Sequence, residues 1–283
     1  GAGLYSDGKL ITRINSELIP WVMNQLVQFG APEEIQWLAN PHVGSDRLRR
    51  VIPYMRQFLM NKGCQFYFDT QITELIYSAH QVVGVRTEYG QEFKSPAVIL
   101  ATGHSATDML MHLHQAGVHL DGKSFAIGLR IEHPQSVINH IQYREFANHP
   151  KLGAANYKLT HHQHSDQSGV YSFCMCPGGY VLSSGTESDG IVCNGMSNYS
   201  RSSKWANSAI VVSIDHQKLF GSDQMGGLQF RQKLEVQAKS QVLAAGGTKQ
   251  LPAQKITDFL SKKLGSIIEN SCPSGAVPTR LDE

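Results

Sequence analysis

The segment at residues 98–106, which reads VILATGHSA, constrains the fold of this chain more than any other. Its four apolar or small residues at 98–101 fit a strand that is covered on both faces. Thr102 and Gly103 let the backbone turn tightly beneath a ligand, and Ser105 fits the N-cap of a following helix. The segment predicts a buried strand, a glycine turn and a helix start, an arrangement that many α/β proteins use without any ligand.

A second glycine-rich stretch lies at residues 1–10, which read GAGLYSDGKL. Three glycines, a Ser-Asp pair and a lysine suit the close approach of backbone amides to a phosphate or a planar ring. An ordinary surface loop has the same composition. The ligand-binding candidates of this stretch are Gly1, Gly3, Ser6, Asp7, Gly8 and Lys9.

Five segments together are more specific than either glycine stretch. In chain order they read GAGLYSDGKL, ILATGHSA, FAIGLRIEHPQ, YSFCMCPGG and NGMS. With these segments in this order, nearly the whole chain resembles the uncharacterised FAD-dependent dehydrogenases often labelled NAD(FAD)-utilising dehydrogenases. The resemblance implies an FAD cofactor and transfer of hydride or electrons through the flavin, with protein groups positioning the substrate.

The resemblance also exposes a missing motif. Members of that family begin with a strand, a GxGxxG turn and an acidic residue for the ribose, and no strand-like run of this chain precedes GxGxxG. Those members also end on a glycine-rich segment that caps the flavin, whereas this sequence stops at residues 280–283. We therefore expect an internal fragment of a longer flavoprotein, which binds no FAD and is inactive by itself.

The expected fold is α/β plus α+β, in two parts. Residues 1–121 would form a partial FAD-binding domain of the two-dinucleotide-binding type, and residues 122–283 a mixed β substrate or cap domain. In the first part, apolar spacing predicts helices at 17–29 and 45–62, the second with Ser45 as N-cap. Strands are predicted at 64–69, 72–78 and 82–88, the last two as a hairpin.

The second part changes in character from Lys123 onward. Strand-like runs at 125–131, 170–176 and 210–214 are broken by polar loops, and one amphipathic helix is predicted at 228–242. A domain of this kind commonly lies over the isoalloxazine ring, so substrate specificity is expected here.

Further cofactor contacts follow from the resemblance. The loop after the 64–69 strand would reach the adenine through the backbone of Gln71 and Ile72, and the Thr102–Gly103 turn would approach the FAD. A plain strand-to-hairpin connection is the alternative for residues 71 and 72.

Three residues are candidates for catalysis. Arg130 and Glu132 share a strand face, either as an ion pair on a solvated surface or as an anion-binding arginine held by Glu132 beside the flavin. His104 and His133 are candidate acids or bases, because the usual pKa of histidine suits proton transfer near neutrality.

The cysteines indicate reduced thiols. Five cysteines at irregular spacing give no disulfide framework of the secreted type. Cys174 and Cys176 would lie on one strand face, as structural or pocket-lining residues or as a redox pair. They have no second CxxC and no nearby histidine pair, so no metal site is predicted.

Composition excludes several partners. The net charge of +2 gives no field that favours nucleic acid, and no apolar run approaches the roughly 20 residues that span a bilayer. A small-molecule substrate of anionic or carbonyl-bearing type and a cytoplasmic location are expected. The interpretation favoured is part of an FAD-dependent oxidoreductase, and the alternative is a non-catalytic binding or scaffold module that does not hold FAD.

Overall fold

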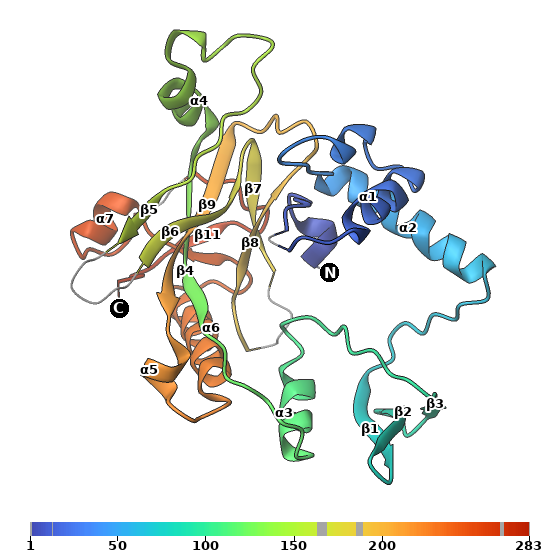
Figure 1. The fold of residues 1–283 in the computed structure, drawn as a ribbon. Coiled ribbons are helices and arrows are strands. Elements are labelled where there is room, and N and C mark those ends of the chain that lie inside the picture. The colour runs from blue at the N-terminus through green and yellow to red at the C-terminus, as the bar shows by residue number, and fades with distance from the viewer. Residues whose placement is uncertain (1, 13, 163–168, 185–188, 267–268, 283) are drawn as a thin grey trace.

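A computed structural model gives the fold of residues 2–12, 14–162, 169–184, 189–266 and 269–282 (Figure 1). Gly1, predicted to bind the cofactor, lies outside these described residues. The central body is an antiparallel sheet flanked by helices, and the N-terminal helices pack beside it. A small three-stranded sheet projects from the body on extended segments.

The N-terminal helical unit has its own apolar core. Its elements are the 3-10 helices η1 (Ala2–Tyr5) and η2 (Glu33–Gln36) and the helices α1 (Leu18–Gln28) and α2 (Ser45–Asn61). The buried core residues are Ala31, Ile35, Val43, Leu48 and Val51. Both predicted helices are confirmed. Ser45 is the first helical residue rather than the N-cap, because Gly44 takes that position with a φ of 81°, a backbone conformation that favours glycine.

The projecting sheet confirms the predicted hairpin. Strands β1 (Ile72–Ser78) and β2 (Gln81–Thr87) pair antiparallel, and β3 (Glu92–Lys94) adds to the free edge of β2. Helix α3 (Thr107–Gln115) contacts β1. It begins after Ala106, which makes no side-chain cap hydrogen bond, so Ser105 is not its N-cap.

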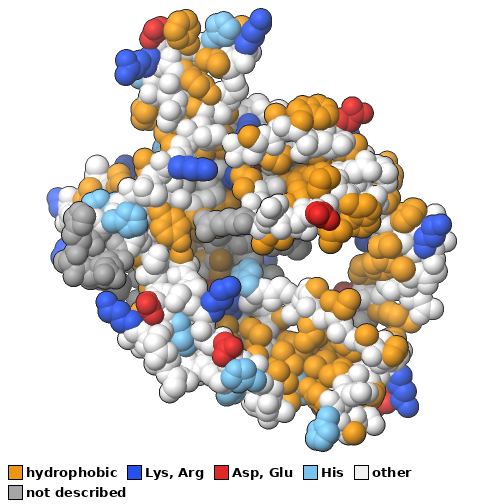
Figure 2. Space-filling view, in the orientation of Figure 1, with side chains coloured by type: hydrophobic (Ala, Val, Ile, Leu, Met, Phe, Trp, Pro, Cys, Tyr) orange, Lys and Arg blue, Asp and Glu red, His pale blue; other side chains and the backbone are white. Residues whose placement is uncertain are grey.

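Two predicted strands are absent from the described structure. Residues 64–69 and 98–101 have no strand conformation and are largely exposed, with Ile99 at 90%. An apolar strand needs a hydrogen-bonded neighbour and a covered face. No described strand pairs with either segment, and although Tyr67 packs on Phe93 with ring centroids 4.6 Å apart, its side chain stays largely exposed. Figure 2 shows hydrophobic side chains gathered on the surface of the part that holds β1–β3.

The central sheet has the order β4-β9-β6-β5. Its strands are β4 (Phe125–Pro134), β5 (Thr160–His162), β6 (Gly169–Cys176) and β9 (Trp205–Ile214). All pairings are antiparallel, and β4 pairs with β9 from Phe125↔Ile214 to Pro134↔Trp205. The three predicted strands of this part are confirmed, and β9 is longer than predicted.

Smaller elements surround this sheet. The hairpin β7–β8 lies against β9 and β6, and α6 contacts the parallel pair β10–β11 through β10. Helix α6 confirms a helix at 228–242, but not its predicted amphipathic character, because Leu234, Val236 and Leu243 are exposed while polar side chains are half-buried. The bounds are α4 (Gln135–Tyr143), η3 (Arg144–Phe146), β7 (Gly179–Ser183), β8 (Cys193–Ser197), α5 (His216–Phe220), α6 (Gly226–Ala244), β10 (Leu251–Ala253), α7 (Ile256–Leu260) and β11 (Ala276–Pro278).

The architecture is therefore mixed, with helices and several antiparallel sheets. This agrees with the α+β part of the predicted fold class. A two-dinucleotide-binding FAD domain and a boundary between residues 121 and 122 stay predictions.

Shortening one buried side chain tests how much the N-terminal core contributes to stability. Ile35 is 2% exposed at the centre of this core, so we expect Ile35→Ala to lower the free energy of unfolding by about 2 to 5 kcal/mol. The measurement is urea unfolding followed by circular dichroism. Ile14→Ala is the matched control, since Ile14 is 70% exposed and its loss should change stability by less than about 0.5 kcal/mol. Equal effects of the two variants would contradict the assignment of this core.

Candidate functional site

Strand β6 ends in a β-bulge that contains the two neighbouring cysteines. Phe173 pairs with Ala209 and Cys176 with Asn207, so β6 advances by one residue more than β9. Cys174 has a φ of 51°, which is uncommon for a residue other than glycine. A bulge redirects the side chains of the strand that carries it, and here the Cys176 thiol donates to the Cys174 carbonyl at 3.4 Å.

Lys9 reaches the bulge from the N-terminal segment. Its Nζ donates to the Met175 carbonyl at 2.5 Å and lies 3.8 Å from the sulfurs of both Cys174 and Cys176. The backbone of Lys9 forms a β-bridge with His42. One ammonium group therefore faces both thiols.

Asp7 holds Lys9 in this position. The carboxylate of Asp7 is 2% exposed and lies 3.2 Å from Lys9 Nζ and 2.9 Å from Arg201 Nη2. A buried carboxylate is stable only with such partners. Burial of Asp7 thus fixes both cations.

Arg130 approaches the same cysteines from β4. Its Nη1 donates to Asn207 Oδ1 at 2.6 Å and lies 3.5 Å from the Cys174 carbonyl. Gly195 on β8 leaves room for these groups, because a Cβ there would lie 2.4 Å from Arg130 Nη1 and 2.9 Å from Cys176 Sγ. We call Lys9, Arg130, Cys174, Cys176 and Asn207 the cation–thiol cluster.

The cluster separates the pKa values of its two thiols. The Cys176 side chain, helped by the charges of Lys9 and Arg130, outweighs burial and lowers the pKa of Cys174 to about 6. The Cys174 side chain, together with burial, raises the pKa of Cys176. Cys174 is therefore a thiolate at neutral pH, and Cys176 carries the proton.

The predicted catalytic residues have different hydrogen-bond partners. Arg130 is in the cluster. His133 Nε2 lies 2.9 Å from Tyr157 Oη, and burial lowers the pKa of His133. His104 is exposed on the segment before α3, where its carbonyl accepts a hydrogen bond from Arg231 at 2.6 Å.

Glu132 does not bind Arg130, contrary to the prediction that it would fix the guanidinium group. Its carboxylate accepts a hydrogen bond from the Ser271 amide at 3.0 Å and one from the Ser271 hydroxyl. Burial raises the pKa of Glu132. Asn207, which sequence reasoning missed, binds the guanidinium group instead.

The predicted cofactor-binding residues fall into two groups. In the first group, Gly3 lies in η1 and residues 6–9 follow it in the chain. The Ser6 carbonyl accepts a hydrogen bond from the Ser45 hydroxyl. In the other group, Gln71 Nε2 donates to Asp108 Oδ2 at 2.8 Å, Ile72 pairs with Thr87, and Thr102 and Gly103 are exposed. Their contacts do not join the two groups, and their cofactor role stays a prediction.

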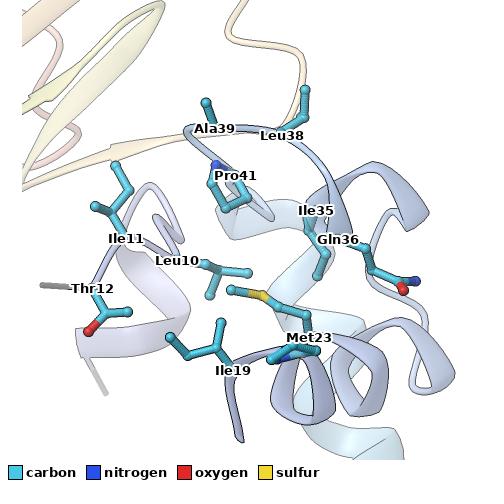
Figure 3. Close-up of a pocket in the computed structure, with 11 residues that line it drawn as sticks. Leu10, Ile11, Thr12, Ile19, Met23, Ile35, Gln36, Leu38, Ala39 and Pro41 are labelled. Carbon is cyan, nitrogen blue, oxygen red and sulfur yellow. The ribbon is translucent and has the colours of Figure 1, made fainter. Parts of the chain in front are cut away.

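Two hollows share Leu10 as a lining residue. One of about 300 Å³ lies between the 10–12 segment, α1 and η2, and Figure 3 shows mostly apolar side chains, such as Leu10, Ile19 and Met23, around it. A second hollow of about 420 Å³ is lined by Leu4, Ser6, Gly8, Lys9, Leu10, Leu48 and Ile52. It includes three of the residues predicted to bind a cofactor, namely Ser6, Gly8 and Lys9.

Comparison with known proteins places the chain in a family. Residues 124–283 match the family described as FAD-dependent protein, C-terminal domain-like. The chain belongs to this family. It is also similar to an uncharacterised protein of Clostridium beijerinckii, at 39% identity over 272 residues that cover 95% of this chain and 50% of that protein. The chain thus spans about half the length of the curated relative it matches.

The family relation raises the question of whether the described residues fit FAD. Gly178 and Gly8 are packed against protein, since a Cβ would lie 1.7 Å from the Arg201 carbonyl oxygen or 2.9 Å from Leu48, respectively. Gly103 is open, but Lys9 is already paired with Asp7. The described residues therefore form no single cradle for a pyrophosphate and do not fit a whole FAD by themselves.

None of the helices that the structure describes is long and apolar enough to cross a membrane. Within the described part of the chain, no group of three or more histidine, cysteine, aspartate or glutamate side chains is placed to hold a metal ion.

The raised pKa of Glu132 predicts a pH effect on stability. The folded protein binds this proton more tightly than the unfolded chain, so stability falls as the pH rises above the usual value of 4.5. Glu132→Gln removes the charge, and we expect its unfolding midpoint in urea to change less with pH than that of the parent over about pH 4 to 7. Glu88→Gln, at an exposed position, should keep the parental slope. A parental slope in Glu132→Gln would show that the carboxylate is not penalised by burial.

Proposed function

We propose that the protein to which this chain belongs is an FAD-dependent oxidoreductase that transfers hydride or electrons through the flavin. One observation carries the proposal: the matched residues 124–283 contain four members of the cation–thiol cluster, Arg130, Cys174, Cys176 and Asn207. The family relation supplies the flavin, and the cluster supplies positive charge at a partly buried site. Such charge stabilises an anionic substrate or a reduced cofactor.

Arg130 is the residue proposed to orient the substrate. Its guanidinium extends from β4 and is fixed by Asn207 on the neighbouring strand β9, which limits its motion. A planar guanidinium can hold a carboxylate or a carbonyl oxygen by directed hydrogen bonds. The proposed substrate is therefore a small anionic or carbonyl-bearing molecule.

His133 is the more suitable of the two candidate bases. Its lowered pKa keeps the ring neutral near pH 7, so it can accept a proton, and Tyr157 fixes its orientation. His104 is exposed on a connecting segment, where water competes for any proton transfer.

The test of the proposed function compares this chain with the full-length protein. We expect the full-length protein to purify with bound FAD, seen as the visible absorption of oxidised flavin and identified after release by chromatography. The 283-residue chain should purify colourless, because a helix N-terminus that binds the pyrophosphate is not among its described sites. A full-length protein that neither retains nor binds added FAD would refute the proposal and favour a binding or scaffold role.

Gly103 offers a sharper test of the predicted cofactor turn. Gly103 has a φ of 80°. Gly90, in the turn between β2 and β3, has a φ of 79°, and a Cβ at either position would have no neighbour within 4 Å. Valine at either position meets the same backbone strain. We expect Gly103→Val in the full-length protein to lose FAD, measured as flavin per protein, while Gly90→Val keeps it. Equal retention in both would show that the 102–103 turn has no part in cofactor binding.

Arg130 can be tested once a substrate has been found. We expect Arg130→Lys to retain FAD but to slow flavin reduction by roughly tenfold to a hundredfold, since a charged hydrogen bond contributes about 1.5 to 3 kcal/mol. Stopped-flow absorbance of the flavin gives this rate. Arg86→Lys is the control, because Arg86 bonds Glu74 and Glu92 on the projecting sheet. A parental rate and substrate affinity in Arg130→Lys would exclude the proposed role.

A further inference from the structure

We propose that Cys174 and Cys176 form a redox-active dithiol that reduces a low-molecular-weight disulfide by thiol–disulfide exchange. This inference goes beyond the flavin-dependent reaction. It rests on contacts within the described residues and does not depend on FAD.

The first support is the position of the two sulfurs. They are one residue apart on a bulge, and both lie 3.8 Å from the same atom, Lys9 Nζ. The Cys176 thiol donates to the Cys174 carbonyl at 3.4 Å, so both side chains lie at the same turn of the bulge. Two cysteines separated by one residue and held against one ammonium are close enough along the backbone for an S–S bond after a local rearrangement of the bulge.

The second support is the difference in exposure. Cys174 is partly exposed, whereas Cys176 is completely buried. An incoming disulfide can therefore reach Cys174 first, and Cys176 is kept for the second step. This division between an accessible attacking thiol and a protected resolving thiol is what exchange requires.

The third support is the charge around Cys174. The Cys176 side chain lowers the pKa of Cys174 most, the charges of Lys9 and Arg130 lower it further, and the nearby carboxylate of Asp7 opposes them. Asp7 is itself paired with Lys9 and Arg201, which reduces this opposition. With a pKa of about 6, Cys174 is largely thiolate at neutral pH, the form that attacks disulfides.

The exchange balances in two steps. The Cys174 thiolate attacks one sulfur of the small disulfide, forming a mixed disulfide and releasing one thiolate. The Cys176 thiol then loses its proton to that thiolate or to water and attacks Cys174 Sγ, which forms the Cys174–Cys176 bond and releases the second thiolate. The protein dithiol loses two electrons, and the small disulfide gains them.

The other cysteines differ in ways that make them controls. Cys193 lies close to Arg130, but burial raises its pKa. Cys64 is exposed on the segment after α2, away from the bulge. Serine at either position should leave the dithiol intact.

Met175 provides a direct test, because cyanogen bromide cleaves after methionine and so separates Cys174 from Cys176. The reduced 283-residue chain is treated with oxidised glutathione without added FAD, alkylated and cleaved. We expect fragments 112–175 and 176–196 to remain joined until a reductant is added. Cys193→Ser should give the same joined pair, since it removes the other cysteine of the second fragment.

Two cysteine variants follow the order of the steps. Cys176→Ser should accumulate a mixed disulfide of glutathione on Cys174, seen by intact mass, whereas Cys174→Ser should acquire none on Cys176. Circular dichroism verifies that each variant is folded. The parent chain itself decides the matter: fragments that separate after oxidation, or that stay joined only while Cys193 is present, would overturn the proposal.

The role of Lys9 is tested by reaction rate. We expect Lys9→Gln to slow alkylation of Cys174 by iodoacetamide at neutral pH by roughly twofold, because the thiolate fraction falls when one of the charges that lower its pKa is removed. The midpoint of the pH–rate profile should rise, and Lys9→Arg should restore most of the rate. An unchanged profile in Lys9→Gln would refute activation by Lys9. None of these outcomes depends on flavin binding, so a failure here leaves the oxidoreductase proposal to its own test.

Discussion

The cation–thiol cluster depends on the ion pairs that the buried carboxylate of Asp7 makes with Lys9 and Arg201. The carboxylate joins the N-terminal segment to Arg201 and, through Lys9, to the end of β6. Removing one partner of a buried ion pair costs about 3 to 5 kcal/mol, because the remaining charge is left without compensation. Lys9 and Arg201 are therefore held against the sheet, and the helical N-terminal unit is held with them. The position of the ammonium between the two thiols is a consequence of this buried charge.

Local signals in the sequence were enough for the elements that make their own contacts. Helices α1 and α2 and the hairpin β1–β2 were predicted because apolar spacing and turns are read within one segment. Residues 64–69 and 98–101 were predicted as strands from the same kind of composition, yet they are exposed. A strand is completed by its neighbour, and the composition of one segment does not report whether that neighbour is present.

The cation–thiol cluster shows a second limit of sequence reasoning. Lys9 and Arg130 were named as candidates, and residues 174–176 as pocket-lining or redox cysteines, but nothing in the sequence brought them together. Lys9 and Met175 are 166 positions apart, and the bulge that turns Cys174 arises from the register between β6 and β9. Asn207 gave no signal, since its role exists only through Arg130. The NGM triplet around Gly195 would have been a usable hint, because a glycine inside a strand marks a close approach.

Several unfavourable features of the fold are concentrated at this cluster. Cys174 has a positive φ, and the buried atoms Asp7 Oδ1 and Asn207 Nδ2 have no hydrogen-bond partner among the described residues. Each such feature costs about 1 to 3 kcal/mol. Replacing buried polar groups with well-packed apolar ones is often neutral or stabilising, so stability alone gives no reason for these features to lie side by side. These features surround two thiols whose pKa values are shifted in opposite directions, and a fixed ammonium and guanidinium group lie beside the same thiols. Such a concentration is typical of a site that serves chemistry rather than packing.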